Sequence, residues 1–522
     1  MPTCLGTEAW CSVTAMQVTA GIDCGAATRR TLVLCEPPFL FWDRSMDRLR
    51  EGEETVPGMG MLVLAAVARE RGYQVHLVDA KGQGASVDDV ARRIVGLRPD
   101  YVGLSATTIS VTNAARIAQR VKALLPGVVT ILGGAHVSAI PERTLEAFPS
   151  LDFGIVGEGE ISLFELLAGL EAGRCVETVA GLVYRRDGRV HTSPRAPYLD
   201  DLDALPLPAW DLLPDFPHRF QPSLFSYPRT PVATLITSRG CPFSCSFCDR
   251  STSGKRGRMH SVEYVVRLCR HLVGLDVRHI IFVDDLFTVR KQRVIDLCEA
   301  FLDEGFTFSW SCNSHPNLLD FQTMQLMRRA GCWQIAYGIE SGSQRILDVV
   351  KREVRIPRMR ETLRMTRAAG IRTKGYVMIG HPTEGLDSLA ETAAFLKQVE
   401  LDLCQITKFT PYPGTPAYPT IRSYGSFEED WEQMNAMNFK FIPTGLSEDT
   451  LETYFDHFYR TFYTRPDILW GLVKLLLHEP KYMKRLGAAS IVYLRSKLAA
   501  GRYVIGRLPR RYRIALAPRP EQ

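Results

Sequence analysis

The sequence predicts an α/β protein with two domains and a helical C-terminal extension. Its 522 residues exceed the usual size of a single hydrophobic core, so two or three domains are expected. Short β-branched apolar runs alternate with segments of helical period in two separate stretches of the chain. Because strands that are covered on both faces read as near-continuous apolar runs, each stretch predicts a parallel sheet between helices.

The first stretch predicts a doubly wound domain of flavodoxin-like topology, which binds ligands outside the carboxyl ends of its strands. Helical-period segments separate its strands, for example 60–72 and 111–125. The predicted strands are residues 31–38, 75–80, 101–108, 128–134 and 153–160.

The second stretch predicts a partial (β/α)6 barrel, with helical segments such as 261–275 and 321–331 and an active site at the carboxyl ends of the strands. The predicted strands are residues 232–240, 279–285, 307–313, 334–341, 373–380 and 404–412.

The alternation of predicted strands and helices stops between the two stretches. Asp187-Gly188 indicates a hairpin turn, and the proline-rich residues 203–217 indicate a connector. We therefore expect five regions along the chain. They are an N-terminal tail (1–30), the first domain (31–173), a linker with the hairpin (174–231), the barrel (232–415) and a helical C-terminal region with a basic tail (416–522).

The charge of the chain lies mainly at one end. Residues 479–522 hold 11 Lys and Arg against 2 Asp and Glu, a charge of +9, which leaves −3 for the rest of a chain whose net charge is +6. This distribution argues against a nucleic-acid-binding surface across the body. The tail mixes apolar and cationic residues, which suits either a helix on an anionic membrane surface or a solvated basic helix.

The cysteine content indicates a reducing compartment. The 13 cysteines are an odd number, the first residues lack the order of a secretory signal, and no apolar run is long enough to span a bilayer. We expect a cytoplasmic protein, with peripheral membrane contact as an option. In that compartment clustered cysteines are more often metal ligands than disulfides.

Cys241, Cys245 and Cys248 follow the first barrel strand with the spacing C-x3-C-x2-C. A disulfide suits neither the compartment nor the odd number of thiols. Structural zinc needs four ligands, and only His260 lies near enough in sequence to be recruited. The third reading is a 4Fe–4S cluster that is held by three thiolates, with one iron left open.

This loop after the first strand of a six-unit barrel resembles the radical S-adenosylmethionine (radical SAM) family, and Phe247 before the last cysteine fits the same pattern. The resemblance implies a 4Fe–4S cluster on Cys241, Cys245 and Cys248, with SAM on the open iron. It further implies reductive cleavage of SAM to a 5′-deoxyadenosyl radical, and a flavodoxin- or ferredoxin-type electron donor.

The resemblance also implies contacts to SAM from other strand ends. These residues are Asp284 and Asp285 after the second strand, Glu340 and Ser341 after the fourth, and Gly380 after the fifth. Each has a structural alternative, as a loop cap, a helix N-cap or a tight turn. Arg256 and Arg258 are expected to be solvated surface charges rather than partners of the cluster.

No catalytic base or radical-quenching residue follows from the sequence. Cys312, Tyr337 and Tyr412 are candidates by position only. The remaining barrel cysteines fall in helical or strand patterns and are expected to be small buried side chains. They are Cys269, Cys298, Cys332 and Cys404.

The first domain resembles the cobalamin-binding domain that precedes the barrel in one radical SAM class. The resemblance places cobalamin against Asp79, Gly84, Ser105, Thr107, Gly133 and Gly134. Lys81 stands where many such domains have a cobalt-ligating histidine, and an ammonium group cannot ligate cobalt. A domain that serves only as a scaffold is the alternative.

Three functions remain open. The first is cobalamin-dependent methylation of an unactivated carbon in a biosynthetic pathway. The second is an oxidative or ring-forming reaction on a porphyrin, lipid or other natural product, as in the anaerobic magnesium-protoporphyrin monomethyl ester cyclases that the chain resembles. The third is a non-enzymatic cobalamin or redox sensor, against which the open iron argues. The substrate is expected to be a small molecule, a lipid or a pigment.

Overall fold

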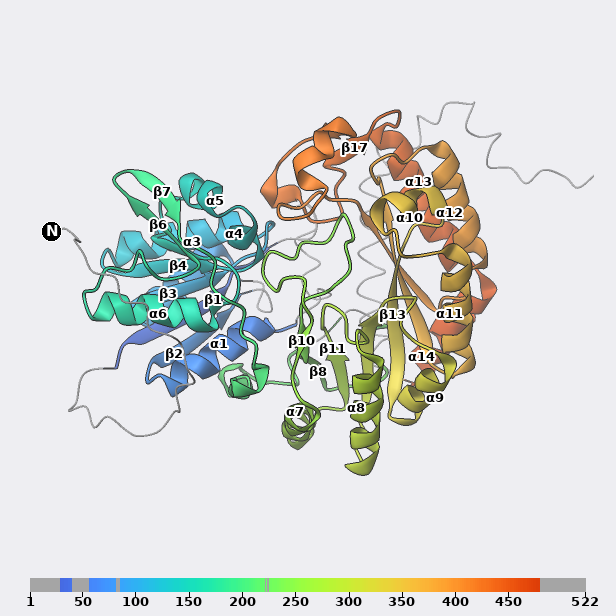
Figure 1. The fold of residues 1–522 in the computed structure, drawn as a ribbon, viewed down its shortest axis with the longest axis horizontal. Helices are drawn as coiled ribbons and strands as arrows, with labels where there is room; N and C mark the ends of the chain where they lie inside the picture. Colours follow the sequence, from blue (N-terminus) through green and yellow to red (C-terminus); the bar gives the residue numbers. More distant parts are fainter. Residues whose placement is uncertain (1–28, 40–55, 81–84, 221, 223–224, 479–522) are drawn as a thin grey trace, which may run out of the picture.

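The computed structural model describes residues 29–39, 56–80, 85–220, 222 and 225–478. Figure 1 shows two α/β units side by side, the first in blue to green and the barrel in green to orange. The basic tail and the loop with Lys81 and Gly84 lie outside the described residues.

The first unit is a seven-stranded sheet in the order β2-β1-β3-β4-β5-β6-β7, parallel from β2 to β5. Its strands are β1 Thr31–Glu36, β2 Gln74–Asp79, β3 Tyr101–Ser105, β4 Val129–Gly133, β5 Phe153–Ile155, β6 Leu182–Arg186 and β7 Arg189–Thr192. The order of the parallel strands is that of flavodoxin-like sheets, which confirms the predicted fold class.

Helices cover both faces of this sheet, and two apolar cores separate them from it. The helices are α1 Met59–Glu70, α2 Val87–Gly96, α3 Val111–Leu124, α4 Ala135–Ala139, α5 Pro141–Ala147 and α6 Gly159–Glu171. One core lies under α2 and α3, where Val90, Ile94 and Ile117 are fully buried. The other lies under α1 and α6, around Ala65 and Leu166.

The hairpin differs from its predicted place. We expected it in the linker, but β6 pairs antiparallel with β5 and β7 with β6, so the hairpin extends the first sheet. The Asp187-Gly188 turn is where the sequence predicts it, and both residues have positive φ. The first sheet therefore extends to Thr192, beyond residue 173.

The barrel is an open sheet of six parallel strands in the order β15-β14-β13-β12-β11-β8. They are β8 Val232–Leu235, β11 His279–Phe282, β12 Ser309–Ser314, β13 Cys332–Glu340, β14 Arg372–Ile379 and β15 Leu403–Lys408. Its helices are α7 Val262–Gly274, α8 Lys291–Asp303, α9 Phe321–Arg329, α10 Gln344–Val350, α11 Ile356–Ala368 and α12 Leu386–Gln398. These units confirm the predicted partial barrel.

The C-terminal region is only partly helical. Helices α13 Glu448–Tyr463 and α14 Pro466–His478 follow the barrel, but β16 Gly425–Phe427 and β17 Phe441–Pro443 form an antiparallel pair before them. A second short pair, β9 Ser238–Arg239 with β10 Arg258–Met259, flanks the cysteine loop. Short 3-10 turns complete the described elements at Leu202–Ala204, Trp210–Leu212, Tyr418–Ser423 and Trp431–Gln433.

None of the helices in the described part of the chain is long and apolar enough to cross a bilayer.

Candidate active site

The cysteine loop leaves the β9–β10 pair at Gly240. Its φ is +87°, and a Cβ there would lie 2.5 Å from the Arg256 carbonyl oxygen, so only glycine fits this turn. Cys241 is half-buried, Cys245 is buried and Cys248 is exposed. None of the cysteines in the described residues is joined in a disulfide.

The thiols act on one another electrostatically. The interaction between Cys245 and Cys248 is the largest cause that lowers the pKa of Cys245 and raises that of Cys248. Burial raises the pKa of Cys241, and the charge of Cys245 adds to that effect. Three thiols from one loop thus lie within electrostatic reach of one another, as ligands of a single cluster must.

The donor set fits a cluster better than a mononuclear ion. Within the described residues no three His, Cys, Asp or Glu side chains converge closely enough to hold one ion, as structural zinc would require. The thiolates of a 4Fe–4S cluster bind separate iron atoms instead. His260 belongs to no such group of ligands in the described residues; its Nδ1 lies 3.0 Å from Asp203 Oδ1 and its ring stacks on Tyr264.

The loop rests on the residue after β12 and on the end of α10. The Phe243 ring stacks on His315, which follows β12, with 3.9 Å between the ring centroids. The Ser246 N–H donates to the Val350 carbonyl at 3.0 Å. Burial lowers the pKa of His315 to about 3, so its ring stays neutral and acts as an aromatic support.

Asp284 and Asp285 follow β11 directly but have different surroundings. Asp284 is buried and accepts hydrogen bonds from Thr237 N at 2.6 Å and from the Ser238 hydroxyl at 3.0 Å. Burial raises its pKa to about 6. Asp285 is exposed in the cavity described below and accepts from Gly240 N at 2.8 Å. Of the two carboxylates, only Asp285 is accessible to a ligand.

The other predicted SAM contacts lie at the ends of β13 and β14. Glu340 is buried with φ +63° and pairs with Lys351. Ser341 is fully buried, and its hydroxyl bonds to Thr392 and accepts from Ser343 N. The residue at the N-cap of α10 is Ser343, and its side chain makes no cap hydrogen bond. Gly380 has φ +90°, and its N–H donates to Glu384 at 2.5 Å.

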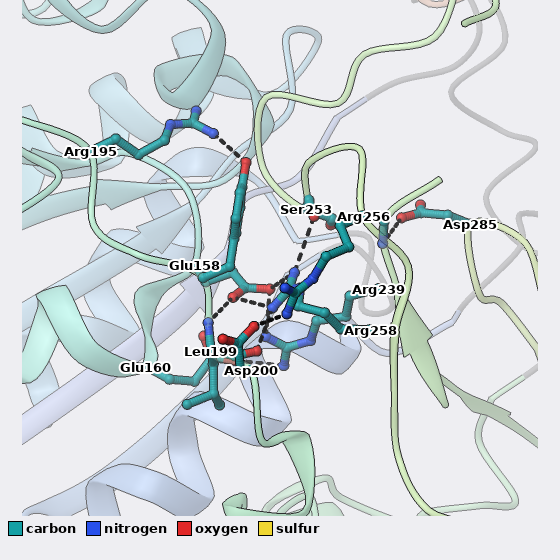
Figure 2. A network of polar contacts seen from close by, with 12 residues as sticks. Glu158, Glu160, Arg195, Leu199, Asp200, Arg239, Ser253, Arg256, Arg258 and Asp285 are labelled. Atoms are coloured by element: carbon teal, nitrogen blue, oxygen red, sulfur yellow. Dashed lines mark hydrogen bonds and ion pairs between the residues drawn. The ribbon is translucent and has the colours of Figure 1, made fainter. Parts of the chain in front are cut away.

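Two arginines beside the cysteine loop bind two glutamates of the first unit (Figure 2). Both Arg258 end nitrogens contact the Glu158 carboxylate, at 2.8 and 2.7 Å. Arg239 lies 2.7 Å from Glu160 and 3.1 Å from Glu158. Arg258 is therefore not the solvated charge that we expected, whereas the exposed Arg256 pairs with Asp200. We call Glu158, Glu160, Arg239 and Arg258 the arginine–glutamate network.

A cavity opens between the carboxyl edge of the first sheet and the barrel. It is lined by Ser105, Gly133 and Gly134 on one side and by Ser238, Arg239 and Asp285 on the other. A second cavity shares Ser105 and Gly134 with it. This second cavity also touches Thr107, Asp249 and Tyr412.

Four of the six residues predicted to contact cobalamin line these cavities. They are Ser105, Thr107, Gly133 and Gly134. A Cβ on Gly133 would meet nothing within 4 Å, so a ligand has room there. Gly134 has φ +101°, a backbone conformation that favours glycine over any other residue. Asp79 differs, because it is 6% exposed and lines neither cavity.

Two of the three candidates for catalysis point away from the barrel mouth. Cys312 is buried in the core between the sheet and its helices, and the Tyr337 hydroxyl lies 2.8 Å from Thr366 Oγ1 of α11. Both predictions are wrong, since these strand positions face the helix layer. Tyr412 lines the second cavity, where burial raises its pKa to about 12. The predicted core cysteines are all buried. They are Cys269, Cys298, Cys332 and Cys404.

Sequence reasoning missed Lys351 and the arginine–glutamate network. Lys351 stands in the run Lys-Arg-Glu, which reads as a solvated helix end. Glu158 and Glu160 belong to a glycine-glutamate repeat after β5, and this repeat was the one available signal.

The comparisons with known proteins agree with this geometry. Residues 235–396 match the radical SAM superfamily, and residues 48–167 match the B12 binding domain. A protein of Pyrococcus horikoshii that is called an uncharacterized methyltransferase is 31% identical over 418 residues, 80% of this chain and 89% of that protein. The anaerobic magnesium-protoporphyrin IX monomethyl ester cyclase of Rubrivivax gelatinosus is 29% identical, over 68% of this chain and 65% of that protein.

Solved structures share the whole arrangement of the two units. The methyltransferase TsrM from Kitasatospora setae, with cobalamin and a 4Fe–4S cluster bound, has a TM-score of 0.62 at 16% identity, over 83% of this chain and 82% of that one. The cobalamin-dependent enzyme OxsB has a TM-score of 0.60 at 19% identity, over 84% of this chain but only 56% of that one. At these identities the likeness shows the fold.

The fold and the cysteine loop together define a radical SAM enzyme. The chain belongs to the radical SAM superfamily, among the members that carry a B12 binding domain before the barrel. Its cofactors are accordingly a 4Fe–4S cluster, SAM and cobalamin.

Proposed function

We propose that the protein is a cobalamin-dependent radical SAM methyltransferase that acts on an unactivated carbon of a small molecule. The observation that carries the proposal is the pair of cavities at Ser105 and Gly134. They bring the cofactor edge of the first sheet next to Asp285 and Asp249, which flank the cysteine loop. A cofactor on one domain and a cluster on the other would then face a common space.

The proposed residues have separate tasks. When bound, SAM at the cluster supplies a radical that removes a hydrogen atom from carbon, and cobalamin supplies the methyl group. Cys241, Cys245 and Cys248 hold the cluster, and Asp285 is placed to accept a hydrogen bond from the SAM amino group. Glu340 and Gly380 stand at the carboxyl ends of β13 and β14, on the same side of the barrel sheet. Tyr412, in the second cavity, is placed to contact the substrate.

The test is anaerobic. The protein is reconstituted with iron, sulfide and hydroxocobalamin, and is then given dithionite and SAM with a deuterated methyl group. We expect bound cobalamin in the visible spectrum, 5′-deoxyadenosine by mass, and deuterated methyl in the product of a candidate substrate. Cys241→Ala should abolish 5′-deoxyadenosine, whereas Cys175→Ala, at an exposed free cysteine, should not. Equal activity of Cys241→Ala and wild type would refute the proposal.

The second candidate is a ring-forming or oxidative reaction, which the similarity to the Rubrivivax cyclase favours. Gly133→Leu separates the two, because its side chain would fill the space above the sheet edge. For a methyltransferase, we expect loss of cobalamin and of label transfer while SAM cleavage persists. Product formation without label transfer, in variant and wild type alike, would favour the second candidate.

Peripheral contact with an anionic membrane is a further part of the proposal. Helix α14 exposes Leu469, Trp470, Val473 and Leu477 on one face, and Lys474 lies beside Trp470. The chain that follows α14 carries the charge of +9. We expect co-flotation with phosphatidylglycerol vesicles that is lost on Trp470→Ser with Leu477→Ser, and kept on Leu124→Ser, an exposed leucine of α3. Equal flotation of both variants would count against membrane contact.

A further inference from the structure

Lys351 places a buried positive charge beside the cysteine loop. It follows α10, its side chain is 6% exposed, and its Nζ donates to the Gly338 carbonyl at 2.8 Å and to Glu340 Oε1 at 3.0 Å. A Cβ on Gly338 would collide with both the ammonium and the carboxylate. The glycine therefore leaves the space that this ion pair occupies.

The cysteine loop is bound to the same segment. The Ser246 N–H donates to the Val350 carbonyl at 3.0 Å, and the Ser244 hydroxyl donates to Glu353 at 3.1 Å. Cys245 lies between these two anchors. The loop therefore cannot shift relative to Lys351 without breaking hydrogen bonds on either side of Cys245.

This segment brings charges next to the cysteine loop. Lys351 follows Val350, whose carbonyl accepts a hydrogen bond from Ser246, the residue after Cys245. Glu353 accepts from Ser244, the residue before Cys245. The loop therefore lies beside a buried cation, its buried counter-charge Glu340 and an exposed anion.

A charge at this place acts on the reduction of a cluster. Three thiolates outweigh the positive charge of a 4Fe–4S core, and reduction adds one electron and thus one more negative charge. A nearby cation stabilises the reduced form more than the oxidised form, and an anion does the opposite. Burial keeps water from screening either effect.

We propose that Lys351 and Glu340 set the reduction potential of the cluster from opposite sides, Lys351 raising it and Glu340 lowering it. The inference rests on the proposed function only in that Cys241, Cys245 and Cys248 hold the cluster. Both residues act through the thiolates and are positioning residues, not catalytic ones. Their effect exists before SAM binds, so it can be measured without SAM.

The experiment is a redox titration of the reconstituted, SAM-free protein, followed by electron paramagnetic resonance. Dithionite supplies the single electron, and no atom is transferred. We expect Lys351→Met to lower the midpoint potential, Glu340→Gln to raise it and Lys351→Arg to leave it near wild type. In Glu340→Gln the Lys351 ammonium keeps the Gly338 carbonyl as a hydrogen-bond acceptor.

Lys440→Met is the matched control. Lys440 is also a nearly buried lysine, with 8% of its side chain exposed, and it pairs with Glu428 at 3.1 Å beside β17. Its removal should leave the potential unchanged. A structural disturbance alone would not move the potentials of Lys351→Met and Glu340→Gln in opposite directions.

The outcomes separate the two proposals. If the wild type takes up no cluster, the proposed function fails. If the cluster is present and the two potentials stay equal to wild type or move together, the inference is overturned while the function stands. Should Lys351→Met fail to fold, Glu340→Gln alone tests the inference. A midpoint potential of Glu340→Gln that is equal to or lower than that of wild type would contradict it. Weaker SAM binding by Lys351→Met at an unchanged potential would also overturn it.

Discussion

Two of the contacts between the first unit and the rest of the chain differ in their chemistry. The arginine–glutamate network is buried, and its arginines stand beside the cysteine loop. The other contact, which we call the Trp431 contact, packs Trp431 against His136 and Phe148 of the first unit, at 4.5 and 5.9 Å between ring centroids. At its rim the half-exposed Arg116 pairs with Glu432 at 2.6 Å.

The difference lies in what each contact can tolerate. A buried charge that loses its partner is left without compensation, so removal of any one charge of the network should destabilise the protein strongly. An aromatic contact with exposed ion pairs at its edge loses stability in small steps. The network therefore fixes the cysteine loop to the cofactor domain, and the Trp431 contact adds graded stability at the edge.

Among these substitutions, Glu158→Gln should have the largest effect on stability. It removes the carboxylate that both arginines share, and we expect a loss of about 3–5 kcal/mol in the free energy of unfolding. Denaturant unfolding measures it, with Arg256→Ala as control, since Arg256 forms an exposed pair that should contribute under about 1 kcal/mol. Equal losses in both variants would show that the network is not the stronger contact.

Trp431→Ala tests the second contact. The side chain is only half-buried, so we expect a loss of about 3 kcal/mol, at the lower end for removal of a tryptophan. Hydrogen exchange should rise in residues 428–438 and in α4, but not around Gly240. If exchange near the cysteine loop rose equally, the two contacts would not be independent.

Acid should loosen the Trp431 contact selectively. Burial, then the charge of Arg143, lowers the pKa of His136 to about 4 against the smaller effect of Glu429. Because this pKa lies below the unfolded value of about 6.5, the neutral ring contributes stability above pH 6.5 that is lost as the pH falls toward 4. The loss is about 1.4 kcal/mol for each pH unit.

Denaturant unfolding of wild type and His136→Gln between pH 7 and pH 4.5 measures this effect. The variant should show a shallower dependence of stability on pH. An identical dependence in both proteins would remove His136 as its cause.

Arg116→Ala should have the smallest effect. Its pair with Glu432 is about half exposed on both sides, so we expect a loss of about 0.5 kcal/mol that disappears at high salt. Thermal unfolding at low and high ionic strength measures it. A loss above about 2 kcal/mol would mean that this exposed ion pair contributes as much to stability as a buried one.

The sequence allowed the two sheets to be predicted because their parallel strands are buried on both faces. The hairpin shows the limit of such reasoning. Asp187-Gly188 indicated the turn, but nothing local in β6 shows that it pairs with β5. Strands β16 and β17 were missed because each is a three-residue strand that follows the regular alternation of strands and helices in the barrel.

Some residues of the candidate site could likewise be predicted from the sequence, and others could not. Cys241, Cys245 and Cys248 could be predicted because their spacing is local. Asp284 and Asp285 could not be told apart, since they are adjacent and Asp284 is enclosed by Thr237, which lies between β8 and β9. The buried charges of Lys351 and Arg258 could not be predicted at all, because their partners lie elsewhere in the fold.

The connector between the units is more than a tether. Leu202, Leu205 and Ala209 pack into the core under α1 and α6, while Trp210 and Leu213 pack into the barrel core. The Ala209 N–H donates to the Leu62 carbonyl of α1 at 3.1 Å. A protease should therefore spare this stretch, although its prolines suggest an open linker, and neither half of the chain cut there would keep a complete apolar interior.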